Sequence, residues 1–150
     1  MSISPGAWII KDGVRTGTIY AWRHQADAVL DQATPVQNTW YTVLAATDDV
    51  KLIYVMDDIE TTGETLECEI TIDGLTLTVS HAAVAGTYYN IFKTLQAQNL
   101  SALSLGTASI SSAYQIALEG QSVAIRVRKT TANGTGNLVA RITWAKLLPT

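Results

Sequence analysis

Alternation of apolar and polar residues around Asp73-Gly74 constrains the fold more than any other feature of this sequence. On both sides of the dipeptide every second residue is apolar, which is the period of a half-buried β-strand. Asp-Gly suits a tight type I′ turn, because both central residues of that turn need positive φ, which Gly adopts freely and Asp tolerates. The segment therefore predicts a β-hairpin, with inward-facing Leu66, Cys68, Ile70, Ile72, Leu75, Leu77 and Val79.

The same period recurs along the chain, in segments separated by turn-forming residues such as Thr61-Thr62-Gly63, Ala85-Gly86 and Glu119-Gly120. No convincing crossover helix joins these segments, so antiparallel pairing is expected. We predict an all-β fold, an antiparallel β-sandwich that is jelly-roll-like and has about eight strands. Besides the hairpin, the predicted strands are residues 40–45, 50–55, 88–92, 113–118, 123–127 and 138–144.

The first 37 residues differ from the β-rich remainder, residues 38–150. Two apolar runs on either side of Asp12-Gly13 indicate a hairpin or an extended N-terminal arm, which would dock onto the domain or onto a neighbouring subunit. After it, Trp22, Ala26, Val29 and Leu30 fall at helical spacing before Pro35, which predicts one short helix. Large apolar side chains in an arm are good interface residues. The candidates here are Trp8, Ile9, Ile10 and Trp22.

Charge is scarce and unevenly distributed. Only 15% of the 150 residues are charged and the net charge is −3, whereas about a quarter of residues are charged in typical proteins. Between Asp48 and Asp73 the acids have Lys51 as their only opposing cation, and no acid follows Glu119. The low charge is explained either by a partner that covers part of the surface or by Thr and Ser side chains that solvate it.

The late basic strands and the early acidic strands invite two interpretations. Alternation places Arg126 and Arg128 on the face opposite the apolar residues of their strand, where they would meet acids of a neighbouring strand in the same chain. Alternatively, the two groups form complementary patches on adjacent subunits. Both interpretations can hold together. Under the second, Arg126, Arg128, Asp57 and Asp58 are interface candidates.

Residues with catalytic or metal-binding potential are few. Cys68 is the only cysteine, and its apolar register predicts a small core residue. His24 and His81 match no zinc-site spacing, and the adjacency of Ser80 to His81 does not make a catalytic triad. Asp57-Asp58-Ile59-Glu60 would offer carboxylates to calcium or to a glycoside, but an acidic strand end before a turn is the ordinary interpretation. We therefore expect no enzyme activity, no cofactor and no metal.

Other binding classes are also disfavoured. The late cations are few and not interleaved with aromatic residues, so nucleic-acid binding is not expected. No secretory signal and no apolar run of about 20 residues is present, which predicts a protein made in a cytoplasm and no membrane partner. The Gly-rich segment 132–137 lacks a phosphate-loop Lys and predicts a hairpin loop. Trp144 is expected in the core, and one of Trp40 and Tyr41 on a surface or interface.

Four segments carry a resemblance to a known family: NTWYTVL at 38–44, VKLIYV at 50–55, the hairpin at 65–77 and LVARITW at 138–144. Together they resemble small β-sandwich virion proteins of tailed phages and related viruses, which include capsid decoration or cement proteins and accessory tail proteins. The resemblance covers roughly residues 38–147. It implies a structural protein of the virion, made in the host cytoplasm. Its partners would be further copies of itself, as a homo-oligomer and by analogy a trimer, and a major capsid or other shell protein.

Two functions therefore follow. In the first, the domain caps or cements a protein shell through subunit contacts, with the arm reaching into a neighbour and the charged strand faces setting orientation. In the second, the chain is a carbohydrate- or host-receptor-binding module that uses exposed aromatic residues. Those residues would be Trp40 or Tyr41, with loop residues near Tyr88, Tyr89 and Asn90.

Overall fold

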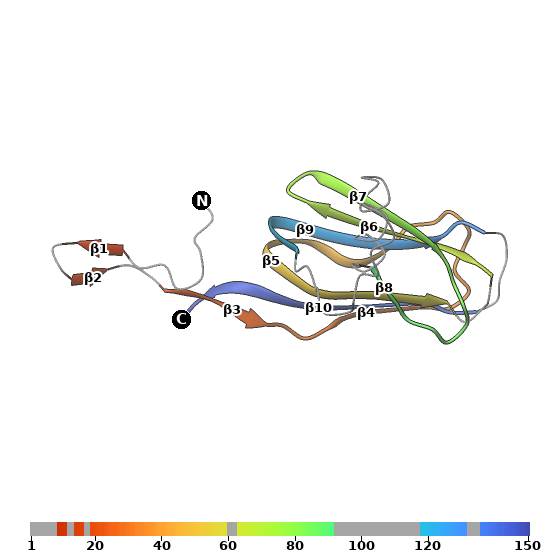
Figure 1. The fold of residues 1–150 in the computed structure, drawn as a ribbon, viewed down its shortest axis with the longest axis horizontal. Helices are drawn as coiled ribbons and strands as arrows, with labels where there is room; N and C mark the ends of the chain where they lie inside the picture. The colour runs from red at the N-terminus through yellow and green to blue at the C-terminus, as the bar shows by residue number, and fades with distance from the viewer. Residues whose placement is uncertain (1–8, 12–13, 17–18, 60–62, 92–117, 132–135) are drawn as a thin grey trace, which may run out of the picture.

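The computed structural model describes residues 9–11, 14–16, 19–59, 63–91, 118–131 and 136–150. All elements with defined bounds in these ranges are β-strands, and every pairing between them is antiparallel, which confirms the predicted fold class (Figure 1). The strands are β1 (Ile9–Lys11), β2 (Val14–Thr16), β3 (Tyr20–His24), β4 (Ala28–Gln32), β5 (Tyr41–Ile59), β6 (Thr65–Ile72), β7 (Leu75–Ala82), β8 (Tyr89–Asn90), β9 (Leu118–Lys129) and β10 (Leu138–Pro149).

One eight-stranded sheet contains every strand from β3 onward, in the order β3-β10-β5-β9-β6-β7, with β4 also beside β10 and β8 beside β5. The sheet folds over on itself. β9, β6 and β7 form one layer, and β10, β3 and β4 form the other (Figure 1). This arrangement gives the two packed layers of a sandwich-like fold. The jelly-roll connectivity stays a prediction.

β5 belongs to both layers and makes the fold continuous. Its first part, from Tyr41 to Leu52, pairs with β9, and its second part, from Val50 to Ile59, pairs with β10. Register shifts interrupt the pairing with β9, and Asp49 adopts φ 55°. Extra residues on one strand of an antiparallel pair bend it and increase its twist. The two strands predicted at 40–45 and 50–55 are therefore a single bent strand.

The predicted hairpin is present as β6 and β7. Asp73 and Gly74 have φ values of 50° and 84°, as a type I′ turn requires. The two strands pair without a register shift from Ile72 opposite Leu75 to Thr65 opposite Ala82. Most residues predicted to face inward are buried or half-buried, but the prediction for Leu75 is wrong. This residue is 64% exposed, because it lies at the turn end of the last strand of its layer.

The core lies between the two layers and takes residues from both. Cys68 is fully buried in it, as predicted, and Trp144 packs against it while only partly buried. A register shift between Thr143 and Trp144 explains why the tryptophan does not continue the inward alternation. The buried residues of the core cluster are Leu44, Val50, Leu52, Val55, Ile59, Leu66, Cys68, Ile70, Val79, Ala83, Ile91, Val123, Ile125, Val127, Leu138, Ala140 and Ile142.

The short helix predicted after Trp22 is wrong. Trp22 lies in β3 opposite Leu147, and Val29 and Leu30 lie in β4 opposite Arg141 and Ala140. Helical spacing arose because two short strands are interrupted at residues 25–27, which shifts the alternation between them. The main sheet thus begins at Tyr20, ahead of the expected boundary at residue 38.

The hairpin predicted in the N-terminal arm is present, whereas the hairpin predicted between the last two strands is not. β1 and β2 pair as a separate two-stranded sheet, which agrees with the hairpin alternative for the arm. The hairpin loop predicted at 132–137 is wrong, because β9 and β10 lie on opposite sides of β5 and do not pair with each other. Their connection joins the two layers. The predicted strand at 113–118 falls outside the described residues, except for Leu118 at the start of β9.

Gly120 is a position where the packing of β9 leaves no room for a side chain. A Cβ atom there would lie 2.5 Å from Cγ2 of Ile72 and 3.1 Å from Cγ2 of Val123. We expect Gly120→Ala to lower the free energy of unfolding by about 1–3 kcal/mol through overpacking, measured by urea denaturation. The control is Gln121→Ala on the exposed neighbour, expected within about 0.5 kcal/mol of wild type. Equal stability of both variants would contradict this packing.

Candidate functional site

The outer face of the layer formed by the first part of β5 with β9, β6 and β7 carries a ladder of ion pairs. Nε of Arg126 lies 2.7 Å from Oε1 of Glu69, and Nη2 of Arg128 lies 2.6 Å from Oε2 of Glu67. These residues face each other directly in the β6–β9 register. The interpretation that the acidic and basic strands pair within one chain is therefore confirmed.

Trp40, the residue before β5, extends this ladder. The guanidinium carbons of Arg126 and Arg128 lie 4.6 Å and 4.3 Å from the centre of its ring. Arginine stacks on indole through its planar, weakly hydrated cation. Each arginine is thus held by a carboxylate and by an aromatic ring. Three of the predicted interface candidates, Trp40, Arg126 and Arg128, consequently form one ordered cluster.

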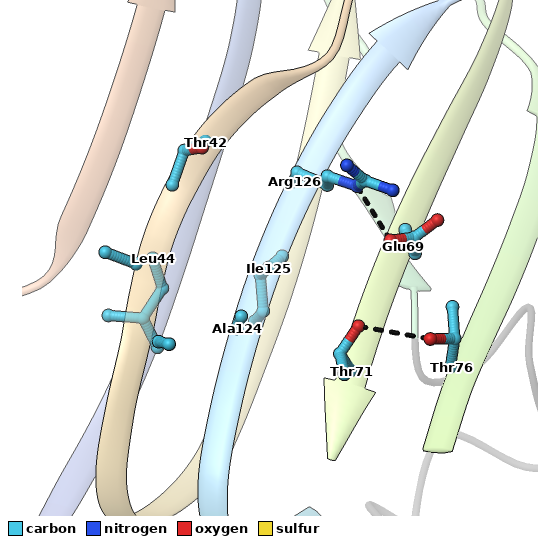
Figure 2. Close-up of a pocket in the computed structure, with 10 residues that line it drawn as sticks. Thr42, Leu44, Glu69, Thr71, Thr76, Ala124, Ile125 and Arg126 are labelled. Carbon is cyan, nitrogen blue, oxygen red and sulfur yellow. Dashed lines mark hydrogen bonds and ion pairs between the residues drawn. The ribbon is translucent and has the colours of Figure 1, made fainter. Parts of the chain in front are cut away.

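A shallow hollow of about 550 Å³ lies beside this cluster on the same face. Neighbouring strands line it (Figure 2): Thr42 comes from β5, Ala124 and Arg126 from β9, Glu69 and Thr71 from β6, and Thr76 from β7. Oγ1 of Thr71 and Oγ1 of Thr76 are 3.3 Å apart and share a hydrogen bond. The alanine methyl group at position 124 leaves space between the longer side chains.

The side chains of this surface offer both hydrogen-bond donors and hydrogen-bond acceptors. Threonine hydroxyl groups both donate and accept hydrogen bonds, and the Arg126–Glu69 pair presents a fixed donor beside a fixed acceptor. The side chain of Arg126 is 46% exposed and that of Glu69 is 15% exposed, so the cation is the more accessible partner. Because paired strands hold all of these residues, the sheet fixes their backbone positions.

A second group of ionisable residues, formed by His81 and Asp57, lies inside the protein between the two layers. His81 of β7 and Asp57 of β5 come from opposite layers, and Nε2 of His81 lies 2.7 Å from Oδ1 of Asp57. Their side chains are 7% and 0% exposed. The ring of Tyr89 lies 4.4 Å from the His81 ring at 30°, and Tyr89 is the pairing partner of Asp57. The pair is a polar contact between the two layers.

The surroundings of this pair set the protonation of both groups. Burial raises the pKa of Asp57, and the hydrogen bond and charge of His81 offset part of that increase. Burial lowers the pKa of His81, but the hydrogen bond and negative charge of Asp57 outweigh it, and the net shift is upward. Asp58, also buried, adds a like charge that raises the pKa of Asp57 further. The native state therefore holds protons here more tightly than the unfolded chain does.

A second buried ion pair lies near the same end of the core. Nζ of Lys129 is 3.7 Å from Oε2 of Glu64, and their side chains are 1% and 6% exposed. Lys129 continues the inward alternation of Val123, Ile125 and Val127. Buried charges of this kind are costly to separate, because a carboxylate or ammonium left alone in the interior keeps its full desolvation penalty. Neither residue lines the outer-face hollow.

The predicted interface residues are dispersed. Trp22 sits in β3, where Nζ of Lys51 lies 5.7 Å from its ring centre, so it belongs to the main sheet and not to a free arm. Asp57 and Asp58 are buried within the protomer, which does not fit an interface role. Tyr41 packs against the core, and its hydroxyl oxygen accepts a hydrogen bond from the Val36 N–H at 2.9 Å.

The remaining candidates belong to the N-terminal hairpin. Ile9 and Ile10 lie in β1, opposite Thr16 and Arg15 of β2, and their interface role stays a prediction. Trp8 is outside the described residues. Within the described chain the contacts of Trp22 are thus with its own domain, and the docking of residues 20–32 is intramolecular.

The contact between His81 and Asp57 was missed from the sequence, although a signal existed. Asp57 has the same alternation as Val55 and Ile59, and His81 has the same alternation as Leu77 and Val79. Two polar residues on apolar faces of different strands call for a mutual partner, since buried polar groups are nearly always hydrogen-bonded. Nε2 of His81 finds that partner in Oδ1 of Asp57.

The described residues contain no group of three or more His, Cys, Asp or Glu side chains positioned to hold a metal ion. The calcium alternative for Asp57-Asp58-Ile59-Glu60 extends beyond them at Glu60. In the same part of the chain, no helix has the length and apolar character needed to cross a bilayer. Comparison with protein-family models, curated proteins and solved structures finds no match.

The upward pKa shift of His81 predicts how stability depends on pH. Because the folded protein keeps this proton above the ordinary pKa of 6.5, its stabilisation is complete below that pH and is lost as pH rises through the raised value. We expect the free energy of unfolding to fall with a slope of at most about 1.4 kcal/mol per pH unit. His81→Gln keeps a hydrogen-bond donor without titrating, and should flatten the curve measured by urea denaturation at pH 6 to 9.

Asp57→Asn is the second variant that tests this pH dependence. It removes the carboxylate that raises the pKa of His81 and leaves the histidine in place. Its curve should also be flatter than that of wild type between pH 6 and 9. If both variants keep the wild-type slope, another group is responsible and the assignment to this pair is wrong.

Proposed function

We propose that this chain is a non-enzymatic structural assembly protein, specifically a virion decoration or cement protein that stabilises a capsid or related protein shell. The observation that carries the proposal is the outer face of β5, β9, β6 and β7. Its arginines are already neutralised in the Arg126–Glu69 and Arg128–Glu67 ion pairs, and the hollow beside them is lined mostly by small and hydroxyl side chains. The resemblance of residues 38–147 to virion proteins supports the same role.

A face of this kind suits contact with another protein. It is rigid, since β9 and β6 pair over seven consecutive residue pairs with no register shift. Burying it leaves no unpaired charge, because each exposed arginine brings its own carboxylate into the contact. Trp40 and the two arginines belong to the residue types that dominate the binding energy of protein interfaces. The hollow would receive a protruding side chain of the shell protein.

The test is cosedimentation of the purified protein with protein shells isolated from its source. Wild type should saturate at a fixed ratio to the shell subunits. Ala124→Arg fills the hollow with a long cation, and should weaken binding about tenfold or more, equivalent to about 1.4 kcal/mol. Its fold should be unchanged, because position 124 faces outward on β9 between the buried Val123 and Ile125.

Val29→Arg is the matched control, because it places the same side chain on the other layer. Val29 is 58% exposed and lies opposite Arg141, which is also exposed. Its binding should equal that of wild type. If Val29→Arg abolishes binding and Ala124→Arg does not, the contact lies on the β10 layer and the assigned face is wrong. No saturable binding of wild type to shells would reject the decoration role.

The hollow also favours a second function, that of a carbohydrate- or receptor-binding module. Thr42, Thr71 and Thr76 hydroxyls with Glu69 and Arg126 are the donors and acceptors that a sugar would use. The aromatic platform expected from Trp40 and Tyr41 does not strengthen it, since the first is stacked by arginines and the second is packed on the core. A glycan array should give a signal that Ala124→Arg removes if this function is right, and none if the assembly role is right.

A further inference from the structure

The hollow on the outer face contains one pair of opposite charges in an otherwise uncharged surface. Among its lining residues, all of which the structure describes, Arg126 and Glu69 are the only charged ones. The others are threonine, alanine, leucine and isoleucine. The lining therefore has no net charge, although it offers a cation and an anion side by side (Figure 2).

Two contacts hold this pair in place. Nε of Arg126 donates a hydrogen bond to Oε1 of Glu69 at 2.7 Å, and the same guanidinium stacks on Trp40. A guanidinium has several N–H donors and a carboxylate has several lone pairs, so one hydrogen bond uses only part of their capacity. The Arg126 side chain is 46% exposed, which leaves it accessible from solvent. The pair can therefore donate to a further group and accept from it.

A primary amide is the group whose hydrogen bonds match this pair. Its carbonyl oxygen accepts and its NH₂ group donates, so one planar group can bond to Arg126 and Glu69 at the same time. The amide is neutral and adds no charge to the contact. A carboxylate would meet the like charge of Glu69, and an ammonium group would meet that of Arg126, which is unfavourable across a contact. The amide is thus preferred over either ion.

The rest of the hollow suits the methylene groups that would carry such an amide. Ala45, Ala46 and Ala124 have short side chains, and the volume of about 550 Å³ lies within the roughly 300–1,000 Å³ usual for ligand sites. No aromatic side chain is among its described lining residues, so a sugar ring finds no stacking platform there. These features favour a side chain that is apolar along its stem and polar at its tip.

We propose that the outer-face hollow binds a primary amide, the side chain of an Asn or Gln that projects from the shell protein. The carbonyl oxygen of this amide accepts from the Arg126 guanidinium, and its NH₂ group donates to the Glu69 carboxylate. This inference rests on the proposed assembly function and names the chemistry of its contact. The hollow thus recognises a neutral group through a pair of opposite charges.

The first experiment is an NMR titration of the full, isotopically labelled chain with propionamide. Backbone amide signals of residues 69–71 and 124–126 should shift and saturate. Propionate and propylammonium are similar in size but charged, and each should bind about tenfold more weakly because it meets a like charge. Methyl glucoside, the probe for a sugar site, should give no saturable shift at the same concentrations.

Glu69→Gln tests the role of the charge pair. The variant keeps a carbonyl acceptor for Arg126 but leaves the cation uncompensated, so propionate should now bind about tenfold more tightly than propionamide. Glu119→Gln is the matched control, because it makes the same substitution in the ion pair of Glu119 with Lys51, neither of which lines the hollow. Its preference for propionamide should equal that of wild type.

Arg126→Gln is the second variant, and it keeps the test decisive should Glu69→Gln fail to fold. It leaves Glu69 as the only charged residue of the described lining. Propylammonium should therefore bind this variant more tightly than propionamide does. A loss of structure would weaken all probes together, whereas the proposed contact predicts that the two variants change the preference in opposite directions.

Several results would overturn the inference. They are the absence of a saturable shift with propionamide, a wild type that binds either ion at least as tightly, and a preference for the amide that survives in Glu69→Gln or Arg126→Gln. A saturable shift with methyl glucoside alone would assign the hollow to a sugar.

These failures are separate from failure of the proposed function. A wild type that prefers propionamide but does not cosediment with shells keeps the amide site and rejects the decoration role. A wild type that cosediments with shells, and loses that binding through Ala124→Arg, but shows no preference for propionamide keeps the decoration role and rejects the amide contact.

Discussion

The strand that both layers share holds this structure together. β5 gives its first part to β9 and its second part to β10, and residues 50–52 pair with both neighbours. A sheet that folds over through one bent strand needs local irregularities at the bend, and the register shifts and the positive φ of Asp49 supply them. Every inward-facing residue of the core depends on this bend, because it brings the two apolar faces together.

The sequence predicts the local features well and the arrangement of strands poorly. Alternation around Asp73-Gly74 specifies the hairpin, since both the turn geometry and the period depend only on nearby residues. The bend in β5 and the break between β3 and β4 shift the alternation, so the sequence pattern predicts two strands where there is one and a helix where there are two strands. The sequence also does not predict that β9 and β10 lie on opposite sides of β5. A Gly-rich connection such as residues 132–137 is compatible both with a hairpin and with a connection between layers.

In the candidate site, too, some contacts can be predicted from the sequence and others depend on how the strands are arranged. The pairing of Arg126 with Glu69 and of Arg128 with Glu67 follows from the uneven charge distribution, once late strands lie beside early ones. The contact between His81 and Asp57 joins residues that no local pattern connects, and it needs the stacking of the two layers. The outer-face hollow has no sequence signature, because it depends on which small side chains of four strands become neighbours (Figure 2).

The pairing of β10 with β3 and β4 has a consequence for how the chain folds as it is synthesised. β3 and β4 have only β10 as a hydrogen-bonded strand partner in the described chain, and β10 comes last among the strands. The backbone N–H of Thr150 even reaches the carbonyl oxygen of Ile19. Contacts between such distant segments form late and slow folding. The early strands must therefore wait for the final one, and their apolar faces are open to chaperones or to incorrect partners until it emerges.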